Sequence, residues 1–140
     1  MKPVEASLTL PNDIETIPQL SEFVETFCEE QMVDMSITLS LNLAIEEAVV
    51  NVMSYAYPAG TYGEVLVKAI ADDKVLTFII SDNGIPFDPT AKADVDTSLS
   101  AEERPIGGLG IHLVKQIMDS VDYQYTDGRN VLTLKKNIHP

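Results

Sequence analysis

The stretch Leu41–Tyr57 (LNLAIEEAVVNVMSYAY) constrains the fold more than any other part of the chain, because it is an apolar helical run that carries polar residues on one face. Glu47 and Asn51 stand four positions apart, so on an α-helix their side chains lie one turn apart on the same side. Apolar residues surround them at helical spacing, namely Ala44, Ala48, Val49 and Val52. We therefore expect a largely buried helix that presents a carboxylate and a carboxamide to a common ligand.

A carboxylate next to a carboxamide suits magnesium-dependent chemistry. The amide oxygen of Asn51 is a hard ligand of the kind that Mg²⁺ prefers, and the carboxylate of Glu47 can orient or deprotonate a nucleophile. The alternative interpretation is a solvated helix face, on which a Glu and an Asn four positions apart occur by chance. Glu46 leaves the register open, because either glutamate can be the functional one.

Composition limits the classes of partner and compartment. The chain of 140 residues is long enough for one domain and too short for two. Its net charge of −13 repels nucleic-acid backbones and anionic membranes, so we expect neither as a partner. The one cysteine, Cys28, cannot form an intrachain disulfide, which fits a reducing cytoplasm. The N-terminus lacks a signal-peptide core and the apolar runs fall short of a membrane span, so we expect a soluble cytoplasmic protein.

Hydrophobic periodicity outside the Leu41–Tyr57 segment predicts the remaining elements. Period-2 and β-branched runs predict strands over Val4–Leu10, Glu64–Ala71, Lys74–Ser81, Val121–Thr126 and Asn130–Lys136. Helical spacing predicts two further helices, over Ile14–Gln31 and Ile111–Ser120. Asp34 or Ser36 is the predicted N-cap of the Leu41–Tyr57 helix.

The order of these elements predicts the fold class. It is an α+β fold, a two-layer sandwich with helices on one face of a mostly antiparallel sheet. A segment rich in Pro, Asp, Ala, Ser and Glu, from about residue 85 to 106, separates the first five predicted elements from the last helix and hairpin. A segment of this length is typical of a functional lid or of a locally disordered loop.

A second motif, Ser81–Phe87 (SDNGIPF), lies at the end of the predicted buried strand Lys74–Ser81. Burying an acid there is costly unless a donor pairs with it. An ionised Asp82 only accepts hydrogen bonds, which suits the exocyclic amine of adenine, and Gly84 allows the backbone to turn sharply. The alternative is an ordinary strand-to-turn Asp-Asn-Gly sequence.

A third motif is the glycine-rich run Gly107-Gly108-Leu109-Gly110, which leads into the predicted helix at Ile111. Helix N-termini offer unpaired N–H groups and a positive dipole end, both of which favour phosphate. The run matches neither the GxxxxGKS/T loop nor GxGxxG, and a simple turn before a helix is the alternative interpretation.

Taken in order, the motifs Glu47–Asn51, Asp82–Asp88 and Gly107–Ile111 resemble the N, G1 and G2 boxes of one ATPase fold. Gyrase, the ninety-kilodalton heat-shock chaperones, histidine kinases and mismatch-repair ATPases share this fold, which is known as GHKL or Bergerat. Within the superfamily the chain resembles the stand-alone anti-sigma regulatory serine kinases over nearly its whole length. The resemblance implies one histidine-kinase-like ATPase domain over residues 1–140, with residues 85–106 as the ATP lid.

The resemblance also implies roles for individual residues. Glu47 would be the base that activates the serine hydroxyl of a protein substrate, and Asn51 would be the magnesium ligand. Asp82 would accept the adenine amine, with Gly84 making room for the base. Residues of the third motif would shape the turn on the phosphate side, with an arginine just before them near the γ-phosphate; these are Arg104, Gly107, Gly108, Leu109 and Gly110.

For the whole protein, the resemblance implies ATP and Mg²⁺ as cofactors, a homodimer, and two protein partners. One partner is an anti-anti-sigma antagonist of the STAS type that is phosphorylated on serine, and the other is a sigma factor that the kinase sequesters in partner switching. An ATP-binding regulatory module with little or no kinase activity is the alternative. A histidine-kinase fragment is a weaker one, because no phospho-accepting helical domain precedes Val4.

Three positions depart from the family pattern. Tyr55 stands where the family often has His, and Arg129 and Asn130 stand where it often has Thr. The sequence therefore does not determine which residues contact the adenine on this side.

Overall fold

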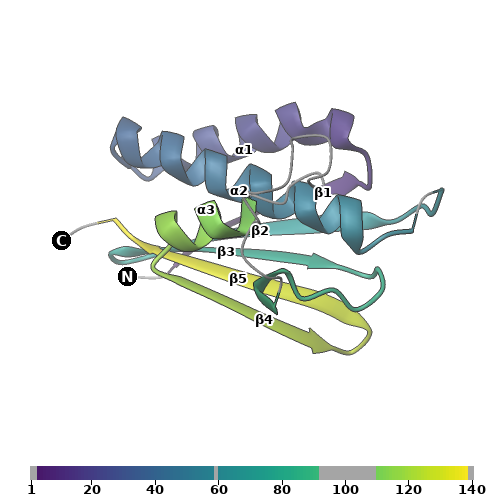
Figure 1. The fold of residues 1–140 in the computed structure, drawn as a ribbon. Helices are drawn as coiled ribbons and strands as arrows, with labels where there is room; N and C mark the ends of the chain where they lie inside the picture. The colour runs from purple at the N-terminus through teal and green to yellow at the C-terminus, as the bar shows by residue number, and fades with distance from the viewer. Residues whose placement is uncertain (1–2, 59, 92–109, 139–140) are drawn as a thin grey trace, which may run out of the picture.

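The computed structural model describes residues 3–58, 60–91 and 110–138, which form a sheet covered by helices (Figure 1). Its strands are β1 (Val4–Pro11), β2 (Glu64–Asp72), β3 (Val75–Asp82), β4 (Ser120–Thr126) and β5 (Arg129–Asn137). Its α-helices are α1 (Ile17–Glu30), α2 (Met35–Tyr55) and α3 (Gly110–Ile117). Two short 3-10 helices, η1 (Ile14–Thr16) and η2 (Pro89–Ala91), precede α1 and follow β3.

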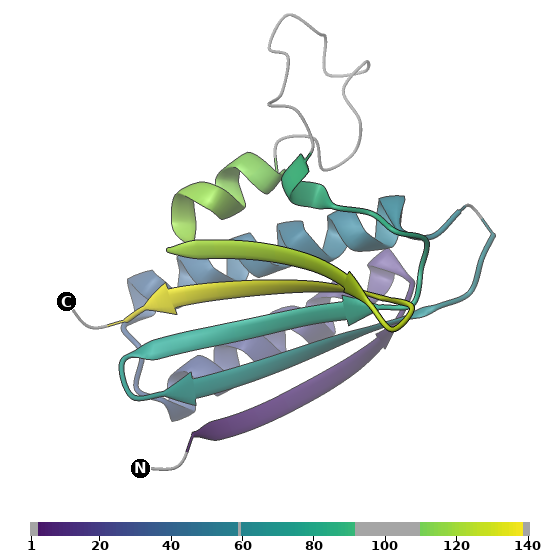
Figure 2. The same ribbon diagram turned by 90° about the horizontal axis from the view of Figure 1, so that it is seen from below.

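The strands form a sheet in the order β1-β2-β3-β5-β4, and every neighbouring pair is antiparallel. All three α-helices lie on one face of it, as Figure 2 shows from the sheet side. Side chains alternate between the two faces of β2, so that Val65, Val67 and Ala69 point toward the helices and are fully buried. The residues between them are only half-buried. The predicted two-layer α+β sandwich is confirmed.

Helix α2 runs through the core. It buries ten residues between Thr38 and Met53, and Asn51 is one of them. The helix begins at Met35, six residues before the predicted start, and ends at Tyr55 instead of Tyr57. Serines and β-branched residues in the first two turns are weak helix formers, so their sequence does not indicate that the helix begins before Leu41. Asp34 is the N-cap as predicted, because its carboxylate accepts the Ser36 N–H at 3.2 Å.

The expectation that no apolar segment has the length of a membrane span needs correction. By length and composition alone α2 meets that criterion, with a mean hydropathy of 1.2 over its 18-residue window. Half of this window is buried inside the protein, where the helix packs on the sheet and on α1 and α3. Its apolar character therefore has a structural cause in the core of the fold.

The other predicted boundaries shift by a few residues. The predicted helix from Ile14 divides into η1 and α1, and the last helix ends at Ile117. Asp127 and Gly128 join β4 to β5 with φ values of 53° and 76°, as a two-residue hairpin turn with positive φ requires. Residues 92–106 of the predicted lid lie outside the described residues.

Candidate functional site

Four buried side-chain oxygens have no hydrogen-bond partner among the residues that the structure describes. They are Oδ1 of Asn12, Oδ1 of Asn42, Oδ1 of Asn51 and Oδ2 of Asp82. Leaving a buried acceptor unpaired costs about 1–3 kcal/mol, so each of these atoms calls for an explanation. Two of the four belong to the residues that the sequence predicts as ligands of a nucleotide complex.

Asn51 is fully buried on α2, and its amide orientation is fixed. Its Nδ2 donates to the backbone carbonyl of Glu47 at 2.8 Å, and only the NH₂ end of an amide can make this bond. The hard amide oxygen is thereby left unpaired. Such an oxygen is a suitable ligand for Mg²⁺, which commonly takes one or two protein ligands and completes its shell with phosphates and water.

Glu47 lies one turn before Asn51, and its side chain is half-buried. Its neighbour Glu46 is half-buried as well. Neither carboxylate forms a hydrogen bond or ion pair within the described part of the chain. The structure thus places Glu47 and Asn51 together as predicted, and burial does not distinguish the two glutamates.

Asp82 is the last residue of β3 and is fully buried. Its Oδ1 accepts two hydrogen bonds, from Gly84 N at 2.8 Å and from Asn130 Nδ2 at 2.9 Å, whereas Oδ2 accepts none. Burial raises the pKa of Asp82, while the bonds from Asn130 and Gly84 and the charge of Arg129 oppose the rise. The carboxylate is therefore anchored through one oxygen, and the other remains as an acceptor.

Gly84 is required by packing within the protein. A Cβ at this position would lie 2.2 Å from the backbone carbonyl oxygen of Ala56, just after α2. That same oxygen accepts the N–H of Ile85 at 2.8 Å. The Asp-Asn-Gly turn therefore packs directly against the backbone that follows α2. This packing is a second reason for glycine at position 84, beside the predicted need for room near the base.

This contact predicts that Gly84→Ala destabilises the protein. Overpacking against rigid backbone typically costs about 1–3 kcal/mol, and urea unfolding measures the loss of free energy of unfolding. Gly128→Ala is the control, because that site has a positive φ of 76° but no atom within 4 Å of the added Cβ. The cost at Gly128 is then the backbone strain of a positive φ without any clash, and a cost at Gly84 below about 0.5 kcal/mol would contradict the packing argument.

The third motif is only partly described. Arg104, Gly107, Gly108 and Leu109 lie outside the described residues, and Gly110 is the first residue of α3. Helix α3 packs against α2, so the described end of this motif adjoins the helix that carries Glu47 and Asn51. Within the described residues no three His, Cys, Asp or Glu side chains group as a metal site.

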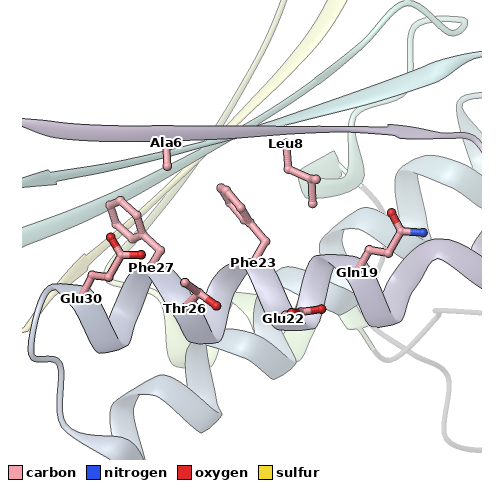
Figure 3. Close-up of a pocket in the computed structure, with 8 residues that line it drawn as sticks. All are labelled: Ala6, Leu8, Gln19, Glu22, Phe23, Thr26, Phe27 and Glu30. Atoms are coloured by element: carbon pink, nitrogen blue, oxygen red, sulfur yellow. The ribbon is translucent and has the colours of Figure 1, made fainter.

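Hollows lie at several places on the surface of the described residues. Glu47, Asn51 and Asp82 line none of three such hollows, one of which lies between α1 and the start of α2. A groove of about 410 Å³ lies between β1 and α1, with side chains of both elements lining it (Figure 3). Strand β1 is at the edge of the sheet, and β2 separates it from β3. A third hollow, of about 430 Å³, adjoins the turn after Asp82 and is lined in part by Asn83, Gly84 and Tyr125.

Sequence reasoning missed the function of Asn130 as a donor. It registers opposite Asp82 in the β3–β5 ladder and is 3% exposed. The sequence offered one signal, namely that the buried acid needs a donor. It did not offer the strand register, which comes from pairing residues 48 positions apart.

Residues 10–136 match the family described as the histidine kinase-like ATPase domain. The serine-protein kinase RsbW of Listeria monocytogenes serovar 1/2a is 34% identical over 99 residues, which cover 68% of this chain and 63% of the relative. The serine/threonine-protein kinase BtrW of Bordetella bronchiseptica is 30% identical over 101 residues, which cover 72% of this chain and 71% of the relative. The chain thus spans less than two thirds of the Listeria protein.

The same fold is found in solved structures. One of them contains the RsbU and RsbW domains of Rv1364c from Mycobacterium tuberculosis, and it matches with a TM-score of 0.68 at 17% identity. The match covers 100% of this chain and 34% of that chain. At this identity the likeness concerns the fold.

Proposed function

Since the chain belongs to the family of histidine kinase-like ATPase domains, we propose that it is an ATP-dependent protein-serine kinase. In this proposal it phosphorylates an anti-anti-sigma antagonist of the STAS type and sequesters a sigma factor. One observation carries the proposal: two buried oxygens, Oδ1 of Asn51 and Oδ2 of Asp82, lack partners at two of the motif positions. Magnesium and adenine are chemically matched to these two acceptors.

The residues fit Mg²⁺ and ATP in distinct ways. Asn51 would hold the metal through its amide oxygen, and phosphate oxygens would supply most of the remaining shell. Bound magnesium neutralises charge on the phosphates. Asp82 would accept the adenine amine through Oδ2, while Gly84 and Asn130 hold Oδ1.

Glu47 would act on the protein substrate. The serine hydroxyl oxygen forms a bond to the γ-phosphorus, and the bond from that phosphorus to the bridging oxygen of ADP breaks. Glu47 accepts the hydroxyl proton, so the products are phosphoserine and ADP. A half-buried carboxylate that has no partner among the described residues is suited to this step.

The partners and the compartment are part of the proposal. The names of the Listeria and Bordetella relatives support protein-serine kinase activity. The net charge of −13 argues against nucleic-acid and membrane partners, and we propose a cytoplasmic homodimer. An ATP-binding module without transfer remains a second candidate, because neither unpaired oxygen acts on the transferred phosphate.

Two assays on the intact chain test the proposal. Calorimetric titration with ATP, with and without Mg²⁺, measures binding, and transfer of labelled γ-phosphate to an antagonist domain encoded beside this gene measures activity. Magnesium-dependent binding with transfer to a serine is the expected result. Binding of ATP and antagonist without transfer would favour the regulatory module, and absence of ATP binding would overturn both candidates.

Asn51→Ala should weaken the binding of magnesium-ATP at least tenfold, because the variant removes a metal ligand; tenfold corresponds to about 1.4 kcal/mol. Binding of ATP without metal should change far less. Asn42→Ala is a matched control on the same helix, since Asn42 is also buried with an unpaired Oδ1, but its Nδ2 bonds Ser21 in α1. Calorimetry that gives both variants the affinity of the wild type would remove Asn51 as a ligand.

A further inference from the structure

Asn130, in β5, has the most complete hydrogen-bond set near Asp82. Its Nδ2 donates to Asp82 Oδ1 at 2.9 Å and to the carbonyl of Ile85 at 2.8 Å. Its Oδ1 accepts the N–H of Phe87 at 2.9 Å and the hydroxyl of Tyr123. An Asn side chain has two donor hydrogens and two lone pairs, and all four are used here. Exchanging the amide N and O would break the bonds to Asp82, Ile85 and Phe87, because a carboxylate or carbonyl only accepts and a backbone N–H only donates.

These bonds determine which oxygen of Asp82 is free. Oδ1 accepts from both Gly84 and Asn130, so its two lone pairs are occupied. The terminal torsion of an Asp side chain is broad and roughly two-fold, and a single bond restrains it weakly. The second bond, from Asn130, holds the carboxylate in one orientation in which Oδ2 alone remains to accept.

The same amide also fixes the turn that follows Asp82. Through Ile85 and Phe87 it ties the segment 85–87 to β5, and through Tyr123 it is tied to β4. A serine or threonine hydroxyl has one donor hydrogen, so it cannot serve Asp82 and the Ile85 carbonyl together. The carboxamide is therefore suited to hold the carboxylate and the turn at once.

We propose that Asn130 is the positioning residue that gives the site its selectivity for a purine with a 6-amino group over one with a 6-carbonyl group. This inference rests on the proposed ATP-dependent function. Adenine offers an amine hydrogen to Oδ2 of Asp82, whereas hypoxanthine offers a carbonyl oxygen that repels it. Selectivity therefore requires Oδ2 to remain the unpaired acceptor, and Asn130 is the side chain that secures this orientation.

The test compares the affinities for ATP and for inosine triphosphate, both with Mg²⁺. The wild type should prefer ATP. Asn130→Asp keeps the shape but removes both donors and sets a second carboxylate beside Asp82, so the ATP-to-ITP affinity ratio should fall roughly tenfold. Asn130→Ser retains one donor, so its ATP-to-ITP affinity ratio should fall by less than that of Asn130→Asp. Tyr123→Phe is the control, because it leaves both bonds donated by Asn130 intact; its ratio should stay within about threefold of the wild type.

The ratio separates positioning from mere stability. A variant that is only less stable would weaken both nucleotides alike, and circular dichroism melting without nucleotide reports that loss independently. An unchanged ratio in both Asn130 variants, with a wild type that prefers ATP, would overturn the inference and leave the proposed function standing. If Asn130→Asp fails to fold, the ratio in Asn130→Ser decides. A wild type that binds neither nucleotide would overturn the inference and the function together.

Discussion

Glu47→Gln is expected to lower phosphate transfer by about 10²–10⁴-fold, the usual contribution of a general base, while leaving ATP binding nearly intact. The replacement is close to isosteric, and the backbone carbonyl of Glu47, which accepts the bond from Asn51, is unchanged. The unpaired oxygen of Asn51 should therefore keep its position. The measurement is single-turnover transfer of labelled γ-phosphate to the antagonist, beside calorimetric titration of the variant with ATP.

Glu46→Gln is the matched control for this prediction. Glu46 and Glu47 are adjacent on α2, both are half-buried, and both lack a partner in the described residues. The two substitutions thus change net charge and helix propensity equally. If transfer is lost in Glu46→Gln but retained in Glu47→Gln, then Glu46 is the base and the assignment of Glu47 is wrong by one residue. Transfer retained in both would exclude either glutamate as the base.

The sheet and its helices could be predicted because their signals are local. The alternation of β2 places Val65 and Val67 inside, and the spacing of Glu47 and Asn51 places both on one side of α2. The first six residues of α2 were missed because Ile37 and Thr38 are weak helix formers, and the helix there depends on its cap at Asp34.

The parts of the site that were not predicted depend on contacts between distant residues. The clash that a Cβ on Gly84 would meet comes from Ala56, at the end of another element. Asn130 reaches Asp82 because β5 pairs with β3 in one register, and a shift by one residue would turn its side chain to the other face. Neither contact leaves a trace in local periodicity.

Asp82→Asn is expected to weaken ATP binding roughly ten- to hundredfold. The amide places a donor or a weaker neutral acceptor where the ionised carboxylate accepts, and losing a hydrogen bond to a charged group costs about 1.5–3 kcal/mol. Asp72→Asn, at the exposed end of β2, makes the same charge change away from the site and should leave the affinity unchanged. Unchanged ATP affinity in Asp82→Asn would remove the adenine assignment.

The same substitution is expected to stabilise the nucleotide-free protein at neutral pH. Burial raises the pKa of Asp82 above its unfolded value, so the folded chain binds this proton more tightly than the unfolded chain does. The contribution of Asp82 to stability is then fully present below the unfolded pKa and is lost as the pH rises through the folded pKa. At pH 7 the buried charge is therefore a cost, which Asn removes.

Urea unfolding at two pH values tests this trade between binding and stability. At pH 7 the gain in Asp82→Asn should be about 0.5–2 kcal/mol, the usual size of a single stabilising change, and it should shrink at acid pH, where the wild-type carboxyl is protonated. Groups that oppose the pKa rise, namely Asn130, Gly84 and Arg129, remain in both proteins. A loss of stability of equal size at both pH values would mean that hydrogen bonding, and not the buried charge, dominates at Asp82. The carboxylate would then stabilise the fold as well as bind the nucleotide. The inference that Asp82 binds nucleotide at a cost in stability would be wrong.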